Sequence, residues 1–292
     1  MSVSGAIMTR REEWELSGAE GETIFGVSDW LADEPAASVT LLHGLKGFSG
    51  YGMLPVIADR LARALPVVVH RFNASHSGMT RNEATFERPD LFARDTWNKQ
   101  VADLRAVTRA ARAGELPGIA SGRRVINAGH SRGGVACLLS AGREGDREEK
   151  PDGVVTLGTP SWCASDVEAK RRELAETGRL ALPSARTGQA LCQGAGWLEE
   201  QLADPAGHDV LGLGARASAP ALLVHGADDE TIPARCAAEL AAARPRGEAL
   251  VIGGCDHVFN TAHPADVSTE PSAALAAAIG AMRRFIERVL GA

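Results

Sequence analysis

The sequence predicts an α/β fold: a mostly parallel, twisted sheet of about eight strands flanked by helices, with a small cap inserted after the sixth strand. Three observations lead to this prediction. Short apolar runs typical of buried strands alternate with segments whose apolar residues recur at helical spacing. The first two expected strands are joined by a tight turn, and one interval between later strands is much longer than an ordinary crossover.

The expected strands fall into two groups. The first two, joined by the turn at 18–21, should form an antiparallel edge of the sheet. The later ones are continuous apolar runs, which are typical of strands buried on both faces. In chain order, the expected strands span residues 12–16, 22–30, 38–43, 66–72, 124–128, 152–159, 219–226 and 248–254.

Apolar residues at steps of three and four predict the helices. In the second of them, Trp97, Val101 and Leu104 lie on one face, and either Asp95 or Thr96 can cap the first turn. The expected helices span residues 54–65, 95–112, 132–142, 166–177 and 271–290.

The long interval lies between the sixth and seventh expected strands, at residues 160–218. It contains Trp162, Trp197 and a charged helical piece at 166–177. We interpret this segment as a cap inserted into one α/β domain that spans residues 1–292, and not as a separate domain.

Composition and charge argue against several classes of protein. The chain has 292 residues, of which 45% are hydrophobic, and its net charge of −6 argues against a nucleic-acid partner. It contains no run of about 18 apolar residues, so we expect no membrane-spanning helix. Residues 1–16 lack the apolar centre of a signal peptide, and the five cysteines form no C-x-x-C pair. We therefore expect reduced thiols in a cytoplasmic protein.

A serine flanked by glycines follows the fifth expected strand. The run Gly129-His130-Ser131-Arg132-Gly133 has the G-x-S-x-G pattern, with a strand before it and a helix after it. Chance alone gives this pattern roughly 0.2 times in a chain of this composition, so the pattern needs support from the rest of the chain. The glycines allow a tight turn that leaves the serine hydroxyl clear, as a nucleophile requires.

Other polar side chains follow neighbouring strands. Because the carboxyl ends of parallel strands meet at one edge of a sheet, these side chains should gather near the serine. The third expected strand ends in His43 and is followed by Gly44-Leu45-Lys46. The seventh ends in His225-Gly226 and is followed by Ala227-Asp228-Asp229, and the last is followed by Cys255-Asp256-His257. A serine, carboxylates and a histidine are the side chains of nucleophilic acyl transfer.

Four motifs together resemble the α/β-hydrolase fold family, within it the esterase and dienelactone-hydrolase-like branch. The motifs are HGLKGF, GHSRGG, HGADDETIP and GGCDHVF, and the resemblance covers about residues 12–290. The order serine, acid, histidine along the chain is that of this family. The resemblance implies a catalytic triad in which Ser131 is the nucleophile, His257 the general base and Asp229 the acid.

Two members of this triad have alternatives nearby. The family spacing of the acid after Gly226 favours Asp229, but Asp228 is the adjacent carboxylate. The histidine that directly follows the last strand is His257, whereas His263 lies in a polar loop before a proline.

The family pattern also implies an oxyanion hole made of two backbone N–H groups. These belong to Arg132, directly after the nucleophile, and to Leu45, directly after His43-Gly44. The Lys46 amide is the alternative second donor.

The predicted substrate-binding residues are Lys46, Phe48, Tyr51 and Trp162. Phe48 and Tyr51 follow the oxyanion loop and would line an acyl pocket, unless they pack against the first helix. Trp162 belongs either to the pocket wall or to the core of the cap. Lys46 and the Arg132 side chain place positive charges where an anionic substrate could meet them, although such groups more often point outward or pair with carboxylates.

The sequence therefore predicts a serine esterase that cleaves small carboxylic esters through an acyl-enzyme. The alternatives are thioester, lactone or peptide hydrolysis or acyl transfer on the same triad, and a non-catalytic ligand-binding protein with this fold. The charged piece at 166–177 offers no broad apolar face, so we expect a small-molecule substrate and no lipid interface. No metal or nucleotide motif stands in a suitable context, so we expect neither a metal nor a cofactor.

Overall fold

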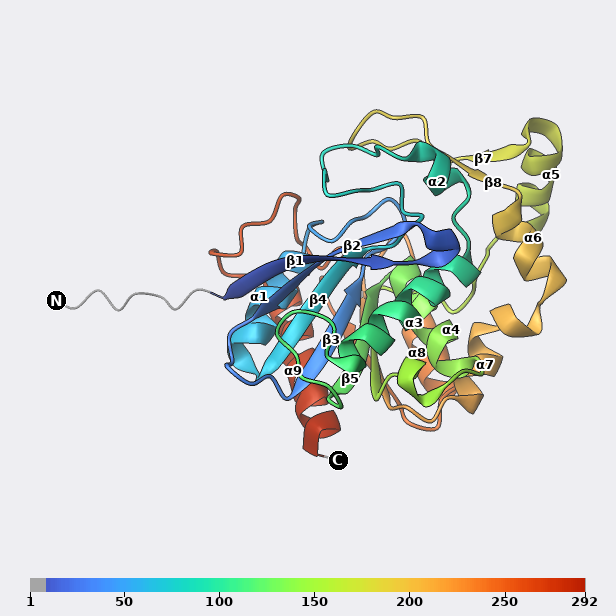
Figure 1. The fold of residues 1–292 in the computed structure, drawn as a ribbon. Coiled ribbons are helices and arrows are strands. Elements are labelled where there is room, and N and C mark those ends of the chain that lie inside the picture. The colour runs from blue at the N-terminus through green and yellow to red at the C-terminus, as the bar shows by residue number, and fades with distance from the viewer. Residues whose placement is uncertain (1–8, 292) are drawn as a thin grey trace.

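The computed structural model describes residues 9–291 and confirms the predicted fold class. Eight strands form the main sheet: β1 (Arg10–Ser17), β2 (Thr23–Trp30), β3 (Ala37–Leu42), β4 (Val67–Asn73), β5 (Arg124–His130), β6 (Gly153–Leu157), β9 (Ala221–Gly226) and β10 (Gly247–Ile252). Their spatial order is β1-β2-β4-β3-β5-β6-β9-β10 (Figure 1). β2 pairs antiparallel with both β1 and β4, and the remaining neighbours in this sheet are parallel.

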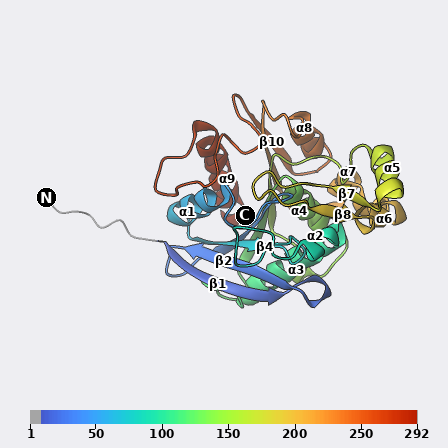
Figure 2. The same cartoon turned by 90° about the horizontal axis from the view of Figure 1, so that it is seen from above.

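Helices cover both faces of the sheet (Figure 2). One face carries α1 (Leu54–Ala64) and α9 (Ala273–Gly291). The other face carries α3 (Trp97–Ala113), α4 (Arg132–Gly142), α7 (Val210–Arg216) and α8 (Arg235–Ala242). Thr96 caps α3 by accepting a hydrogen bond from the Lys99 amide, so the second of the two predicted caps is the one used.

Two apolar cores separate the sheet from these helix layers. Side chains alternate along each strand, so that Val39 and Leu41 of β3 enter the core under α1 and α9, whereas Leu42 enters the core under α3 and α4. Both faces of β3 are therefore buried, and its two polar residues, Ser38 and Thr40, form hydrogen bonds to His70 and Asn127.

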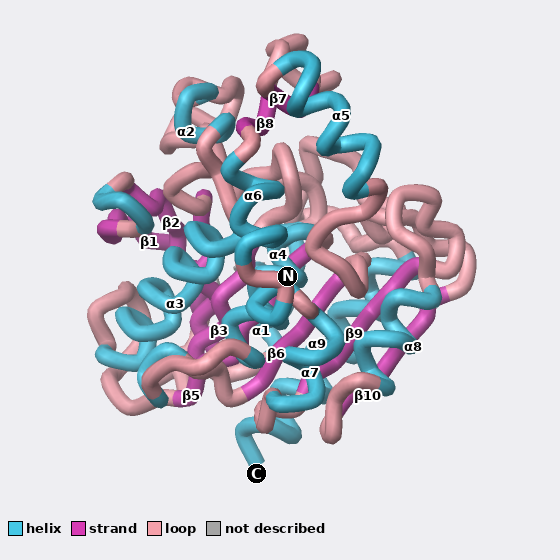
Figure 3. The backbone as a smooth tube through the Cα atoms, turned by 90° about the vertical axis from the view of Figure 1, so that its right-hand side faces the viewer, coloured by secondary structure: helices cyan, strands magenta, loops and turns pink. Residues whose placement is uncertain are grey.

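The segment 160–218 divides into two parts. α5 (Val167–Thr177), the hairpin of β7 (Arg179–Ala181) and β8 (Cys192–Gly194), and α6 (Gly196–Ala203) lie beyond the carboxyl ends of the strands (Figure 3). α7 instead returns to the helix layer beside α4 and α8, because Val210 and Leu213 are buried in the core there. We infer that the cap consists of the part before α7, and we use the word cap for residues 160–204 below.

Residues 1–8, which belong to the segment predicted to lack a signal peptide, lie outside the described residues. Within residues 9–291, no helix is both long and apolar enough to cross a membrane.

Candidate active site

Ser131 occupies a sharp turn between β5 and α4. Its backbone has φ 51° and ψ −117°, a conformation that is unfavourable for a residue with a side chain. The N–H of Ser131 donates to the Leu157 carbonyl over 2.8 Å, which ties the turn to the end of β6. A Cβ atom at Gly133 would lie 2.4 Å from the Leu42 carbonyl oxygen, so only glycine allows α4 to start this close to β3.

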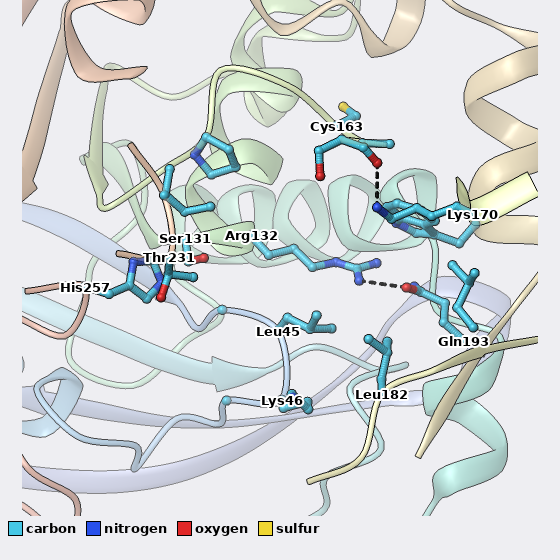
Figure 4. Close-up of a pocket in the computed structure, with 18 of the residues that line it drawn as sticks. Leu45, Lys46, Ser131, Arg132, Cys163, Lys170, Leu182, Gln193, Thr231 and His257 are labelled. Carbon is cyan, nitrogen blue, oxygen red and sulfur yellow. Dashed lines mark hydrogen bonds between the residues drawn. The ribbon is translucent and has the colours of Figure 1, made fainter. Parts of the chain in front are cut away.

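Asp229 and His257 meet at the same edge of the sheet, each in the loop after its strand. The Nδ1–H of His257 donates to Asp229 Oδ2 over 2.7 Å. Ser131 and His257 both line one pocket at this edge (Figure 4). The structure thus gathers the three predicted triad residues from the ends of β5, β9 and β10.

Asp229 is held as an ionised carboxylate. Burial by itself would raise the pKa of this group, but hydrogen bonds from His225 and His257 and from the Ile232 amide lower it well below its usual range. Oδ1 accepts from the amides of Thr231 and Ile232 over 2.9 and 2.8 Å. The carboxylate is therefore fixed in orientation and keeps its charge at neutral pH, as a partner of an imidazolium must.

The alternative acid and base lie elsewhere. Asp228 is exposed, and its amide donates to the Cys255 carbonyl. The His263 ring stacks on Tyr51 at a centroid distance of 4.8 Å, and its Nδ1 accepts from the Gly52 amide. The structure brings Asp229 to His257, and gives Asp228 and His263 other surroundings.

Two further histidines support His257 and Asp229. Nε2 of His225 lies 3.2 Å from Asp229 Oδ2 and 2.9 Å from the Ile232 carbonyl oxygen, so its N–H is shared between them. Nε2 of His130 donates to the backbone oxygen of His257 over 2.9 Å, and burial lowers the pKa of His130 to about 3. No role was assigned to His225 from the sequence, so its contact with Asp229 was not predicted.

The two expected oxyanion donors flank Ser131. Arg132 is the first residue of α4, where a helix leaves backbone N–H groups without intrahelical partners. The loop at Gly44 passes beside the nucleophile, since a Cβ built on Gly44 would lie 3.1 Å from the Ser131 Cβ. Lys46 has a positive φ of 60°, which turns the chain directly after Leu45. Both Leu45 and Lys46 line the pocket, so either amide remains the second donor.

The pocket has a volume of about 860 Å³ and lies between the sheet edge and the cap. Three of the predicted substrate-binding residues line it, namely Lys46, Tyr51 and Trp162. Phe48 does not line it, because its ring packs in a separate apolar cluster with Met79, Phe86, Phe92 and Leu191. Within residues 9–291, no three His, Cys, Asp or Glu side chains are grouped so that they could hold a metal ion.

Comparison with known proteins identifies the family. A sequence profile described as the alpha/beta hydrolase family matches residues 41–270, which is most of the chain. The chain belongs to the alpha/beta hydrolase family. No curated protein sequence matches this hydrolase.

Solved structures resemble this alpha/beta hydrolase in fold at low sequence identity. Est1E from Butyrivibrio proteoclasticus has a TM-score of 0.66 at 16% identity, and the alignment covers 96% of this chain and 99% of that one. A thermophilic esterase from Thermogutta terrifontis has a TM-score of 0.63 at 16% identity, with 95% and 99% covered. A dienelactone hydrolase from Anabaena variabilis has a TM-score of 0.59 at 16% identity, with 96% and 98% covered.

The Arg132 side chain forms a buried polar cluster in this hydrolase that sequence reasoning missed. The side chain is 7% exposed, and its Nη2 lies 3.0 Å from Oδ2 of Asp95, which is 4% exposed. Its guanidinium carbon lies 4.8 Å from the Trp97 ring centroid and 5.8 Å from that of Trp197. Nη1 donates to Gln193 Oε1 over 3.4 Å. The only signal in the sequence was the unusual place of an arginine directly after the nucleophile.

Proposed function

We propose that this alpha/beta hydrolase is a serine esterase that cleaves small carboxylic esters through an acyl-enzyme. One observation carries the proposal: a buried carboxylate holds His257 at the pocket that also contains Ser131 on its strained turn. This arrangement supplies a nucleophile, a base and a group that orients the base.

The reaction is expected to proceed in two steps. His257 takes the proton of the Ser131 hydroxyl as its oxygen attacks the ester carbonyl, and Asp229 stabilises the imidazolium that forms. The backbone N–H groups of Arg132 and of Leu45 or Lys46 bind the oxyanion of the tetrahedral intermediate. His257 then protonates the departing alcohol, and water releases the acid from Ser131 in the second step.

Two observations favour a small ester. The pocket of about 860 Å³ is of the size that encloses a compact ligand. Within α5, all of which the structure describes, no residue is buried and charged residues are frequent, so the cap is unlike the apolar lid of a lipase. Among the similar structures, one is named as a thermophilic esterase, and another, Est1E, is described with ferulic acid bound.

A cytoplasmic location belongs to the same proposal. All five cysteines are free thiols, and four of them are buried, which fits a reducing compartment.

The test is active-site labelling with a fluorophosphonate combined with hydrolysis of 4-nitrophenyl butyrate. We expect one labelled serine, Ser131, and a loss of labelling and of nearly all turnover in Ser131→Ala. Ser121→Ala, a change at an exposed turn before β5, serves as the matched control and should keep both.

The outcome also separates the alternatives. Unchanged turnover in a folded Ser131→Ala protein would refute the nucleophile, and a wild-type protein without a covalent adduct would indicate a non-catalytic binding protein. Labelling without ester turnover would point to another acyl chemistry on the same triad, which a panel of thioesters, lactones and peptides then identifies.

A further inference from the structure

Basic side chains outnumber acidic ones among the residues that line the pocket, although the chain as a whole has a net charge of −6. The lining contains four basic side chains and two acidic ones: Lys46, Arg132, Lys170 and Arg186 against Asp166 and Glu173. Further carboxylates lie behind this lining, namely Asp95 and Glu200 near Arg132 and Asp229 behind His257. An anionic ligand would therefore meet mostly cations at the wall of the pocket.

Three of the basic side chains hold neutral partners. Nζ of Lys46 donates to the Pro183 carbonyl over 3.1 Å, and Nζ of Lys170 donates to the Ser165 carbonyl. Arg186 donates to the carbonyls of Glu83 and Ala84. Carbonyl oxygens have no formal charge, so these contacts position the cations without neutralising them.

Arg132 is different because it is buried and has donors to spare. Among the described residues, Nε and Nη2 of Arg132 have no hydrogen-bond partner, since Nη2 lies at ion-pair distance from Asp95 without hydrogen-bond alignment. A buried donor without an acceptor costs roughly 1–3 kcal/mol, and more when it is charged. The guanidinium would therefore gain from an acceptor that comes within hydrogen-bond distance of these two nitrogens, which neighbouring side chains cover in this structure.

The neighbours of Arg132 offer donors as well. The Nε1 groups of Trp97 and Trp197 are buried without a hydrogen-bond partner among the described residues, and both rings line the pocket beside the guanidinium. Figure 4 shows that Arg132 extends from the Ser131 turn across the pocket towards Gln193. This part of the pocket is rich in N–H groups and lies one side chain away from the nucleophile.

We propose that the pocket selects esters that carry a carboxylate group, and that the Arg132 guanidinium binds this carboxylate. A guanidinium matches the two oxygens of a carboxylate in a planar fork, and the flanking indole rings keep water away from the pair. The inference rests on the proposed esterase function and gives its substrate class. The proposal gives the Arg132 side chain a role of its own, separate from that of its backbone N–H. The N–H remains when the side chain is replaced, because every residue except proline has one.

The experiment compares pairs of esters that differ in one carboxylate group, which is blocked as a methyl ester in the first pair and absent in the second. On the acyl side, 4-nitrophenyl hemiadipate is compared with its methyl ester. On the alcohol side, 3-carboxy-4-nitrophenyl butyrate is compared with 4-nitrophenyl butyrate. The triad acts on both members of a pair, so its contribution cancels in the ratio of their kcat/KM values. The pair that shows a preference for its anionic member tells which half of the substrate carries the carboxylate.

We expect the wild type to prefer the anionic member of one pair. Arg132→Met keeps the aliphatic part of the side chain and should lower that ratio roughly ten- to a hundredfold, because it removes a hydrogen-bonded charge pair. Asp95→Asn removes the competing carboxylate and should raise the ratio. The matched control is Arg143→Met at the other end of α4, where the arginine donates to Gly207 and Asn98 outside the pocket, and the ratio should not change.

A binding measurement keeps this inference separate from catalysis. Calorimetric titration of the wild type with adipic acid monoamide and with hexanamide should show tighter binding of the acid, and Arg132→Met should abolish the difference. Equal ratios and equal binding in wild type and Arg132→Met would show that Arg132 and Asp95 form a structural ion pair only, and would overturn the proposal. Binding that depends on Arg132, without hydrolysis of any ester, would refute the esterase and retain the carboxylate site.

Discussion

Two helices of equal length border the pocket and are built in opposite ways. α4 has 11 residues, and every one from Arg132 to Ala141 is buried against the sheet and its neighbouring helices. α5 also has 11 residues, all described by the structure, and none of them is buried. Only Val167 and Leu174 of α5 pack, partly buried, against the apolar core.

This difference separates the groups to which we assign the chemistry from the groups that cover them. Ser131 and the N–H of Arg132 must be placed within a fraction of an ångström, and α4 and the neighbouring strands leave them no freedom. The cap has only to enclose the substrate, which a helix with few apolar contacts can do. Substitutions near the sheet edge should therefore have large effects, and substitutions in the cap small ones.

The largest effect is expected at the triad acid. Asp229→Asn should lower kcat for 4-nitrophenyl butyrate roughly a thousandfold or more, because His257 loses the carboxylate that fixes its tautomer. Asp228→Asn, one residue away and exposed, should change kcat little. The reverse ranking of the two variants would contradict the assignment of the acid.

The next effect concerns the free energy of unfolding. Leu138→Ala in α4 removes a side chain that is fully buried and should cost about 2–5 kcal/mol. Leu174→Ala in α5 should cost less than about 1 kcal/mol, because the side chain is only partly buried. Urea unfolding followed by tryptophan fluorescence measures both values. Similar losses for the two variants would show that the cap is as firmly packed as the sheet core.

A smaller effect tests how the cap limits the substrate. With 4-nitrophenyl esters from acetate to palmitate, kcat/KM should fall about tenfold or more from the short chains to the longest, because α5 has frequent charged residues and no buried one, and so offers a long chain no broad apolar surface. Rates that climb to palmitate, with a sharp rise once micelles form, would instead indicate that the cap engages lipid.

The smallest effect is a pH dependence of the preference for anionic esters. Burial raises the pKa of Asp95 to about 6, opposed by Arg132 and Gln100, with Glu200 and Lys99 as the further charged groups nearby. Above this pH, the ionised Asp95 competes with the substrate for Arg132; below it, Asp95 is neutral. The kcat/KM ratio of the preferred pair should therefore rise a few-fold as the pH falls from 7.5 to 5.5, and it should stay constant in Asp95→Asn. A substrate carboxylate with a pKa of about 4.3 remains ionised throughout this range.

The strands and helices that have a regular pattern of apolar residues could be predicted from the sequence. Each of the eight expected strands has a counterpart in the main sheet, and the five expected helices match α1, α3, α4, α5 and α9. These elements follow from local patterns. A strand that is buried on both faces is mostly apolar along its length, and a helix that is buried on one face has apolar residues at steps of three and four. The sequence did not predict the hairpin of β7 and β8 or the short helix α6. The two strands of the hairpin have only three residues each, which is too short to show such a pattern.

Which residues gather at the sheet edge also follows from the sequence. Ser131 directly follows β5, and Asp229 and His257 lie three and five residues after the ends of β9 and β10. The carboxyl ends of parallel strands meet at one edge whatever the details of packing. The side chains around them were decided by tertiary contacts. The Phe48 side chain packs in an apolar cluster instead of lining the pocket, and His225 contacts Asp229, the proposed triad acid.

The clearest case of a tertiary decision is the environment of Arg132. Its side chain contacts Gln193, 61 residues further along the chain, and Asp95 and Trp97, which lie at the start of α3. No local pattern records such contacts, because they depend on how the cap and α3 pack against the first turn of α4. The sequence determined that a cation follows Ser131. Only the tertiary structure decided that this cation is buried, flanked by two indole rings and left with donors that have no hydrogen-bond partner among the described residues.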